Sequence, residues 1–151
     1  MNSQEENKQI VSDVERKQIL LSIFWRKGAE GETIKAADIS KDYCVYPPLT
    51  QLLEEGELPI IFWLDEGIAH GIISTRKVIC DIAGVLELVK LTEMLKVSPK
   101  SFPLSQADGL EIKSLSKKSF VFPCDPGAPL SGVWHILQNC LRRNTRIREA
   151  H

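Results

Sequence analysis

The sequence predicts an α+β fold in which an antiparallel meander sheet is closed by a C-terminal helix and preceded by an N-terminal helical segment. Residues 57–81 hold apolar runs rich in β-branched and aromatic side chains, and Asp65-Glu66-Gly67 supplies a turn between two of them. After residue 127 the apolar spacing changes from alternation to a helical period. The sheet is therefore expected in the middle of the chain, with helices at both ends.

The N-terminal helix is expected over residues 5–26, where apolar side chains recur at helical spacing until Gly28 and Gly31. These apolar positions are Ile10, Val14, Leu20, Leu21, Ile23 and Phe24. A short helical pattern at Ile34, Ala37 and Ile39 follows, and a further short helix after Pro47-Pro48 is closed by Gly56. The segment before the sheet is thus predicted to be helical.

Six strands are expected, joined by turns that contain Gly, Asp, Ser or Lys, and a surface loop is expected at Ser98–Pro103. The strands are residues 58–64, 68–75, 77–82, 85–90, 110–115 and 119–123. We divide the chain into a helical segment at 1–56 and a β domain with its C-terminal helix at 57–151. Because 151 residues with 43% hydrophobic content suit one core, the two are expected to form one globular unit.

Charge and hydropathy narrow the class of partner. Lys and Arg number 19 against 20 Asp and Glu, so the net charge of -1 provides no field for nucleic acid or an anionic membrane. No apolar run approaches the roughly 18 residues of a spanning helix, and the polar N-terminus does not resemble a signal peptide. We expect no nucleic-acid partner, no membrane insertion and a cytoplasmic location.

Catalytic and metal-binding motifs are missing from the sequence. The HExxH, P-loop, GxGxxG and GxSxG patterns are absent, and no two cysteines have CxxC spacing. We predict that the chain is not an enzyme and has no catalytic residue, metal or cofactor. An enzyme built from His70, Asp81 and Asp125 is a less favoured alternative, which requires these side chains to share a pocket.

The four cysteines, Cys44, Cys80, Cys124 and Cys140, are widely spaced along the chain. We expect isolated buried thiols, because free cysteine behaves as a small apolar residue. A disulfide between two of them stays open as an alternative, although it would be unexpected in a reducing compartment.

Two segments carry a resemblance to a known family. GIISTRKVI at residues 71–79 places Thr and basic residues between apolar strands, which resembles bacterial pleckstrin-homology-like domains. DPGAP at residues 125–129, followed by the helix that contains Trp134, is similar to small bacterial proteins, some of them immunity-type proteins. The resemblance covers roughly residues 57–142. It implies a partly open pleckstrin-homology-like barrel and a protein that neutralises a cognate bacterial toxin domain by occluding its active site.

Two charge clusters are candidate binding sites. Acidic residues near the first strand turn are predicted to converge on a patch that binds a protein partner: Glu54, Glu55, Glu57, Asp65 and Glu66. The alternative is a module that binds a lipid headgroup, peptide or other small ligand through basic residues between strands: Arg76, Lys77, Lys117 and Lys118. We interpret Arg142, Arg143, Arg146 and Arg148 as a solvated helix end that complements the helix dipole, rather than as an anion site.

Overall fold

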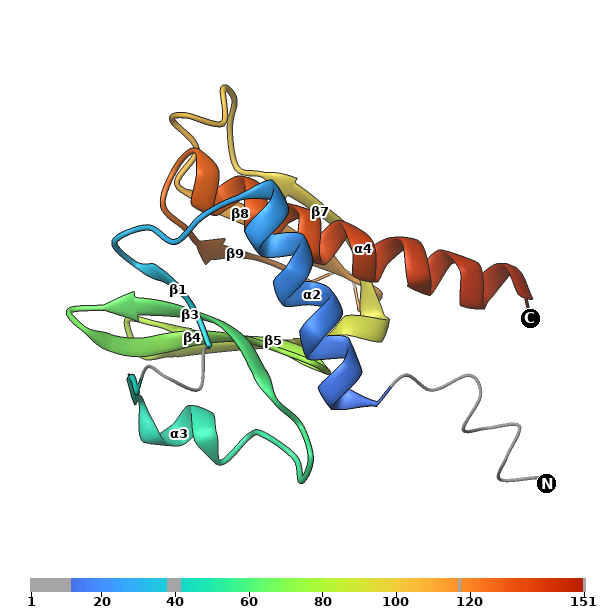
Figure 1. The fold of residues 1–151 in the computed structure, drawn as a ribbon, viewed down its shortest axis with the longest axis horizontal. Helices are drawn as coiled ribbons and strands as arrows, with labels where there is room; N and C mark the ends of the chain where they lie inside the picture. Colours follow the sequence, from blue (N-terminus) through green and yellow to red (C-terminus); the bar gives the residue numbers. More distant parts are fainter. Residues whose placement is uncertain (1–11, 38–41, 117, 151) are drawn as a thin grey trace.

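The structure is a computed structural model that describes residues 12–37, 42–116 and 118–150. It has the α+β class that the sequence predicts (Figure 1). The elements are, in chain order, α2 (Asp13–Lys27), β1 (Ile34–Ala36), β2 (Cys44–Val45), α3 (Pro47–Thr50), β3 (Pro59–Asp65), β4 (Ile68–Ser74), β5 (Lys77–Ile82), β6 (Val85–Lys90), the 3-10 helix η1 (Leu91–Glu93), β7 (Met94–Pro99), β8 (Gly109–Ser114), β9 (Ser119–Pro123) and α4 (Ala128–Ala150).

The strands form a larger sheet in the order β1-β3-β4-β5-β6 and a smaller sheet in the order β7-β8-β9. The meander from β3 to β6 is antiparallel, as predicted. Strand β2 joins the larger sheet by parallel pairing with Ile68 and Ala69 of β4, which β5 leaves unpaired on that side. Strand pairing among the described residues gives two separate sheets rather than one closed barrel, and β6 ends the order of the larger sheet.

Two-residue turns join β3 to β4 and β5 to β6. Both central residues of each turn have positive φ, namely 52° and 80° at Glu66 and Gly67, and 52° and 83° at Ala83 and Gly84. Positive φ at both positions matches the right-handed twist of the flanking strands. Because the meander alternates in direction, these two turns lie at one end of the sheet and the β4–β5 turn lies at the other.

Apolar side chains fill both faces of the larger sheet. On one face, α2 and α4 cross beside the smaller sheet, and Phe24, Ile61, Phe122 and Ile136 belong to one buried cluster. On the opposite face lies α3, where a second buried cluster includes Leu49, Phe62, Ile72 and Ile79 (Figure 1). The first cluster joins α2 and β1 to the β domain in a common core.

Both helical ends of the chain were predicted, with differences in their bounds. Helix α2 begins at Asp13 after the N-cap Ser12, whose side chain accepts a hydrogen bond from the N–H of Glu15, and it ends at Lys27 with Gly28 as its C-cap. The predicted helix positions 5–11, including Ile10, lie outside the described residues. Helix α4 contains the predicted apolar face and continues to Ala150.

Two segments were predicted wrongly. The helical pattern at Ile34 and Ala37 is wrong because residues 34–36 form β1, where pairing with β3 buries Ile34 and Ala36 on one face; Ile39 lies outside the described residues. The loop predicted from Ser98 begins only after Pro99, which ends β7. Proline is tolerated there because β7 is the outer strand of its sheet.

Candidate functional site

The structure does not bring the five predicted acidic residues together. Glu54 and Glu57 lie before β3, whereas Asp65 is the last residue of β3 and Glu66 follows it in the β3–β4 turn. A seven-residue strand separates the two groups by about 20 Å. Glu55 is exposed beside Glu54. The acidic residues therefore lie at the two opposite ends of the larger sheet, and Glu57 is buried.

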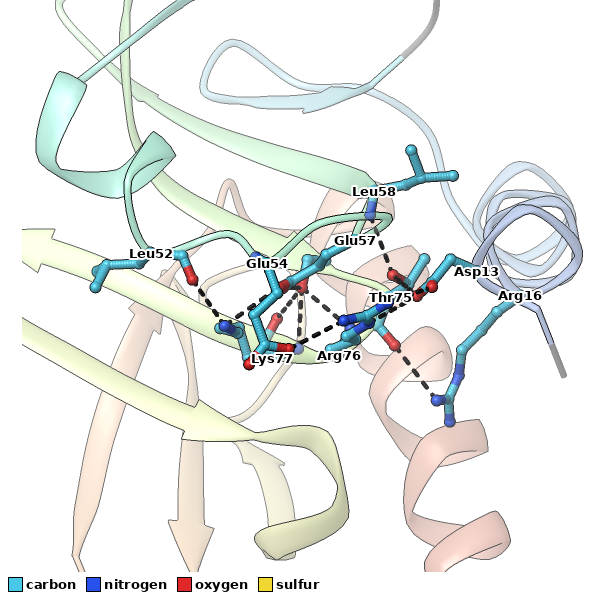
Figure 2. Close-up of polar contacts among 10 residues, drawn as sticks. Asp13, Arg16, Leu52, Glu54, Glu57, Leu58, Thr75, Arg76 and Lys77 are labelled. Atoms are coloured by element: carbon cyan, nitrogen blue, oxygen red, sulfur yellow. Dashed lines mark hydrogen bonds and ion pairs between the residues drawn. The ribbon is translucent and has the colours of Figure 1, made fainter. Parts of the chain in front are cut away.

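Glu57 is the centre of a buried polar cluster at the β4–β5 end of the sheet. Its carboxylate lies 3.1 Å from the ammonium of Lys77 and accepts hydrogen bonds from the Ser74 hydroxyl and from the N–H of Glu54 (Figure 2). The Lys77 ammonium also donates to the carbonyl of Leu52, at 2.8 Å. Glu57 and Lys77 are 6% and 7% exposed, so the pair fastens the loop before β3 to the start of β5 within the protein interior.

Arg76 connects the same turn to α2. Its guanidinium lies 2.7 Å from the Asp13 carboxylate and 3.0 Å from that of Glu54, and Thr75 donates a hydrogen bond to Asp13 (Figure 2). The hydrogen bond from Arg76, followed by the one from Thr75, holds the pKa of Asp13 below its ordinary value, and burial opposes this shift only in part. Both carboxylates raise the pKa of Arg76. This contact could not be predicted from local sequence, because Asp13 and Arg76 are 63 residues apart.

These contacts change the interpretation of the alternative basic site. Arg76 and Lys77 each have carboxylate partners, two of which belong to the predicted acidic cluster. Lys118 is exposed next to β9 in the smaller sheet, and Lys117 lies outside the described residues. Arg76 and Lys77 therefore form an ion network with Glu54, Glu57 and Asp13, in which the Glu57–Lys77 pair is buried and the Glu54–Arg76 pair is at the surface.

We expect Asp13 to make stability depend on acid pH. A carboxyl whose folded pKa is depressed stabilises the fold above its unfolded pKa of about 3.9, and this contribution is lost as the pH falls through the folded pKa. Urea unfolding at about pH 5 and about pH 3 should show a smaller loss for Asp13→Asn than for the unchanged protein. Asp65→Asn, at an exposed turn, is the control and should keep the full loss. An equal loss in Asp13→Asn and the unchanged protein would contradict this assignment.

A cavity of about 270 Å³ adjoins the ion network. Its charged lining residues are Arg16, Glu54, Arg76, Lys77 and Lys90, which come from α2, the loop before β3, the β4–β5 turn and the end of β6. The N-terminal helix thus supplies a wall of this cavity through Arg16, whose guanidinium also donates to the carbonyl of Thr75 at 3.3 Å.

The other end of the larger sheet carries an exposed apolar surface rimmed by carboxylates. Strand β6 is the outer strand of its sheet, and three of its apolar side chains are exposed: Val85 is 60%, Leu86 45% and Leu88 43% exposed. We name this area the hairpin surface and define it by the residues of both two-residue turns and their flanking strands: Asp65, Glu66, Ile68, Asp81, Ile82, Val85, Leu86, Glu87 and Leu88. It contains two of the predicted partner-binding residues, Asp65 and Glu66. A usable signal was present, since VLELV places apolar residues on both faces of the last meander strand.

A second apolar feature is a groove of about 490 Å³ beside α2. Val14, Leu21 and Trp25 line it together with Ala36 and Ala37, and Trp25 is 51% exposed. Its lining residues come from α2, from β1 and from the residues next to β1 and β3, and none of them lines the cavity at the ion network or belongs to the hairpin surface.

The side chains considered for catalysis have structural contacts on different elements. His70 stacks on Tyr46 with ring centroids 4.7 Å apart, and Asp125 accepts hydrogen bonds from the N–H groups of Thr33 and Ile34. Asp81 accepts a hydrogen bond from the Gly84 N–H in the β5–β6 turn. No group of three or more His, Cys, Asp or Glu side chains suited to a metal ion occurs within residues 12–37, 42–116 and 118–150.

All four cysteines are free thiols, and the prediction of burial is correct for Cys80, Cys124 and Cys140. Cys44 is exposed. Burial raises the pKa of Cys140 to about 11 and that of Cys80 to about 12, so these thiols are protonated at neutral pH. The buried cysteines therefore act as core residues.

Comparisons with models of protein families, with curated proteins and with solved structures found no significant match to this chain. The resemblance to pleckstrin-homology-like and immunity-type proteins therefore stays a prediction. The helices of the described residues are too short or too polar to cross a lipid bilayer.

Proposed function

We propose that this chain is a non-enzymatic protein-binding protein whose docking surface is the hairpin surface. The observation that carries the proposal is the exposure of Val85, Leu86 and Leu88 on β6, the outer strand of the larger sheet. An exposed apolar edge strand favours pairing with another chain, and proteins that leave such an edge open commonly use it for binding.

The geometry favours binding by strand addition. In an antiparallel pair, alternate N–H and C=O groups of the outer strand point away from its neighbour, so β6 offers backbone hydrogen bonds on the side opposite β5. Its side chains offer apolar contact on both faces of the sheet: Val85 shares a face with the buried Val89, and Leu86 and Leu88 share the other. An extended partner segment would gain backbone hydrogen bonds and side-chain burial together.

The charge of the hairpin surface favours a basic partner. Asp65 and Glu66 are exposed at the β3–β4 turn, and Asp81 and Glu87 flank the β5–β6 turn. An apolar centre with a charged rim is the usual plan of a protein interface, and rim charges of one sign accelerate association with a partner of the opposite sign.

The proposed partner follows from the family resemblance. Immunity-type proteins imply a cognate bacterial toxin domain, which this chain would neutralise by covering its active site. A toxin domain with a basic surface would suit the acidic rim. The lipid-headgroup alternative is less favoured, since Arg76 and Lys77 are engaged with Asp13, Glu54 and Glu57.

Replacing Leu88 by lysine should weaken partner binding more than about thirtyfold, because a charge would enter the apolar centre of the interface. Tagged protein captured from its native cells should retain one stoichiometric partner in the unchanged form and lose it in Leu88→Lys. Titration calorimetry with the purified partner then gives the change in Kd. The matched control is Leu95→Lys, since Leu95 is 47% exposed on β7, the outer strand of the smaller sheet.

Retention of the partner by Leu88→Lys would contradict the proposal. Equal loss in Leu88→Lys and Leu95→Lys would also contradict it, because the effect would then not be specific to β6. If the unchanged protein instead self-associates, and Leu88→Lys abolishes the self-association, the partner on the hairpin surface is a second copy of this chain and not a toxin domain.

A further inference from the structure

The cavity at the ion network is lined by more cations than its carboxylates can neutralise. Asp13 and Glu54 both pair with Arg76, and Glu57 pairs with Lys77, so three carboxylates face four cations once Arg16 and Lys90 are included, an excess of one positive charge. Arg16 and Lys90 line the same cavity. Within the described residues, neither of these two cations has a carboxylate at ion-pair distance.

A third cation lies beside them on α4. The pKa of Arg143 is lowered, first by burial and then by the positive charge of Arg16. Helix α4 is fixed at this place by Asn144, which is 4% exposed and donates a hydrogen bond to the carbonyl of Leu91, the residue after Lys90. Arg143 likewise has no ion-pair partner in the described part of the chain. Three elements, α2, β6 and α4, therefore each bring an unpaired cation to one region.

An excess of positive charge in a partly enclosed cavity favours the binding of an anion. Like charges repel, and a partly buried guanidinium loses solvation. A ligand with two or more negative oxygens relieves both effects, because guanidinium groups bind such oxygens in a bidentate manner and lysine adds a point charge. The sequence did not indicate this cluster, because the three cations are distant along the chain and Arg143 was interpreted as part of a solvated helix end.

We propose that the cavity binds a phosphate group, with Arg16 and Lys90 as direct ligands and Arg143 as a neighbouring positive charge. A volume of about 270 Å³ lies just below the ~300–1,000 Å³ typical of pockets for drug-sized ligands, so it suits a phosphate group or a small phosphorylated molecule. Glu54 on the cavity wall shares Arg76 with Asp13, and its remaining negative charge is outweighed by Arg16, Lys90 and Arg143 together. The site lies at the opposite end of the sheet from the hairpin surface and does not depend on the proposed function.

The test is a titration of the ¹⁵N-labelled protein with inorganic phosphate at constant ionic strength, followed by amide chemical shifts. Saturable shifts are expected at residues 16, 76–77 and 90–92. Lys90→Gln and Arg16→Gln should each weaken binding about tenfold or more, which is the effect of one charge-assisted hydrogen bond. Lys113→Gln, at an exposed position of β8, is the matched control and should leave the affinity unchanged.

A second arm distinguishes the source of the phosphate. Co-sedimentation is measured with phosphatidylcholine vesicles that contain or lack phosphatidylinositol phosphate. If the protein binds phosphate but not the vesicles, the ligand is a soluble phosphorylated molecule. If it binds both phosphate and the vesicles that contain phosphatidylinositol phosphate, and Lys90→Gln weakens both, the ligand is a lipid headgroup. Shifts that do not saturate, or an affinity that Lys90→Gln and Lys113→Gln change equally, would overturn the proposal.

Discussion

Replacing Glu57 by alanine is expected to lower the free energy of unfolding by about 3–5 kcal/mol, the cost of leaving one partner of a buried ion pair alone. The Lys77 side chain is 9% exposed and that of Glu57 is fully buried, so the alanine variant leaves an ammonium group in the interior whose remaining hydrogen-bond partner among the described residues is the Leu52 carbonyl. The Ser74 hydroxyl loses its carboxylate acceptor as well.

Urea unfolding of four proteins separates the ion pair from other effects: the unchanged protein, Glu57→Ala, Lys77→Met and the double variant. The double variant should be more stable than Glu57→Ala, because removal of both charges leaves no uncompensated ion. Glu55→Ala, at an exposed neighbouring carboxylate, should change stability by less than about 0.5 kcal/mol. A loss below about 1 kcal/mol in Glu57→Ala would show that the pair is not buried as described.

Gly28→Ala is expected to destabilise the protein by about 3 kcal/mol, the upper range for forcing atoms into a filled core. A Cβ at Gly28 would lie 2.4 Å from the carbonyl oxygen of Ala128 and 2.5 Å from the Cα of Gly132. Both neighbours are backbone atoms of α4, so the two helices must move apart. The cause is steric, because the φ of Gly28, -159°, is open to any residue.

Thermal or urea unfolding of Gly28→Ala is compared with that of Gly67→Ala. A Cβ at Gly67 meets no atom within 4 Å, but its φ of +80° disfavours alanine by about 1–2 kcal/mol. The smaller loss in Gly67→Ala measures backbone strain alone. A loss in Gly28→Ala no larger than that in Gly67→Ala would contradict the close crossing of α2 and α4.

The meander was predictable because its signals are local. Asp65-Glu66-Gly67 and Ala83-Gly84 stand between apolar strands, and the positive φ at Gly67 and Gly84 is a conformation that glycine adopts without steric cost. Strand β1 was not predictable in the same way. It has three residues, and its pairing with β3 depends on a contact nearly thirty residues away along the chain.

The candidate sites were only partly predictable from the sequence, for the same reason. Residues 54–57 and 65–66 are close in sequence, yet the length of β3 holds them apart. Arg76 was predicted as a ligand-binding residue of the alternative basic site, and its partner Asp13 could not be predicted before α2 was placed on the sheet. The sequence predicted β6 as a strand with apolar residues. The exposure of these residues could not be predicted, because it depends on β6 being the last strand in the sheet order.

Hydrogen–deuterium exchange of the complex with the captured partner tests the docking proposal most directly. The proposal predicts that amides of residues 82–90 exchange faster in the free protein and become protected in the complex, because β6 then lies between two strands. Protection confined to α2 around Val14 and Trp25, with residues 82–90 unchanged, would contradict it and would place the partner on the groove beside α2 instead.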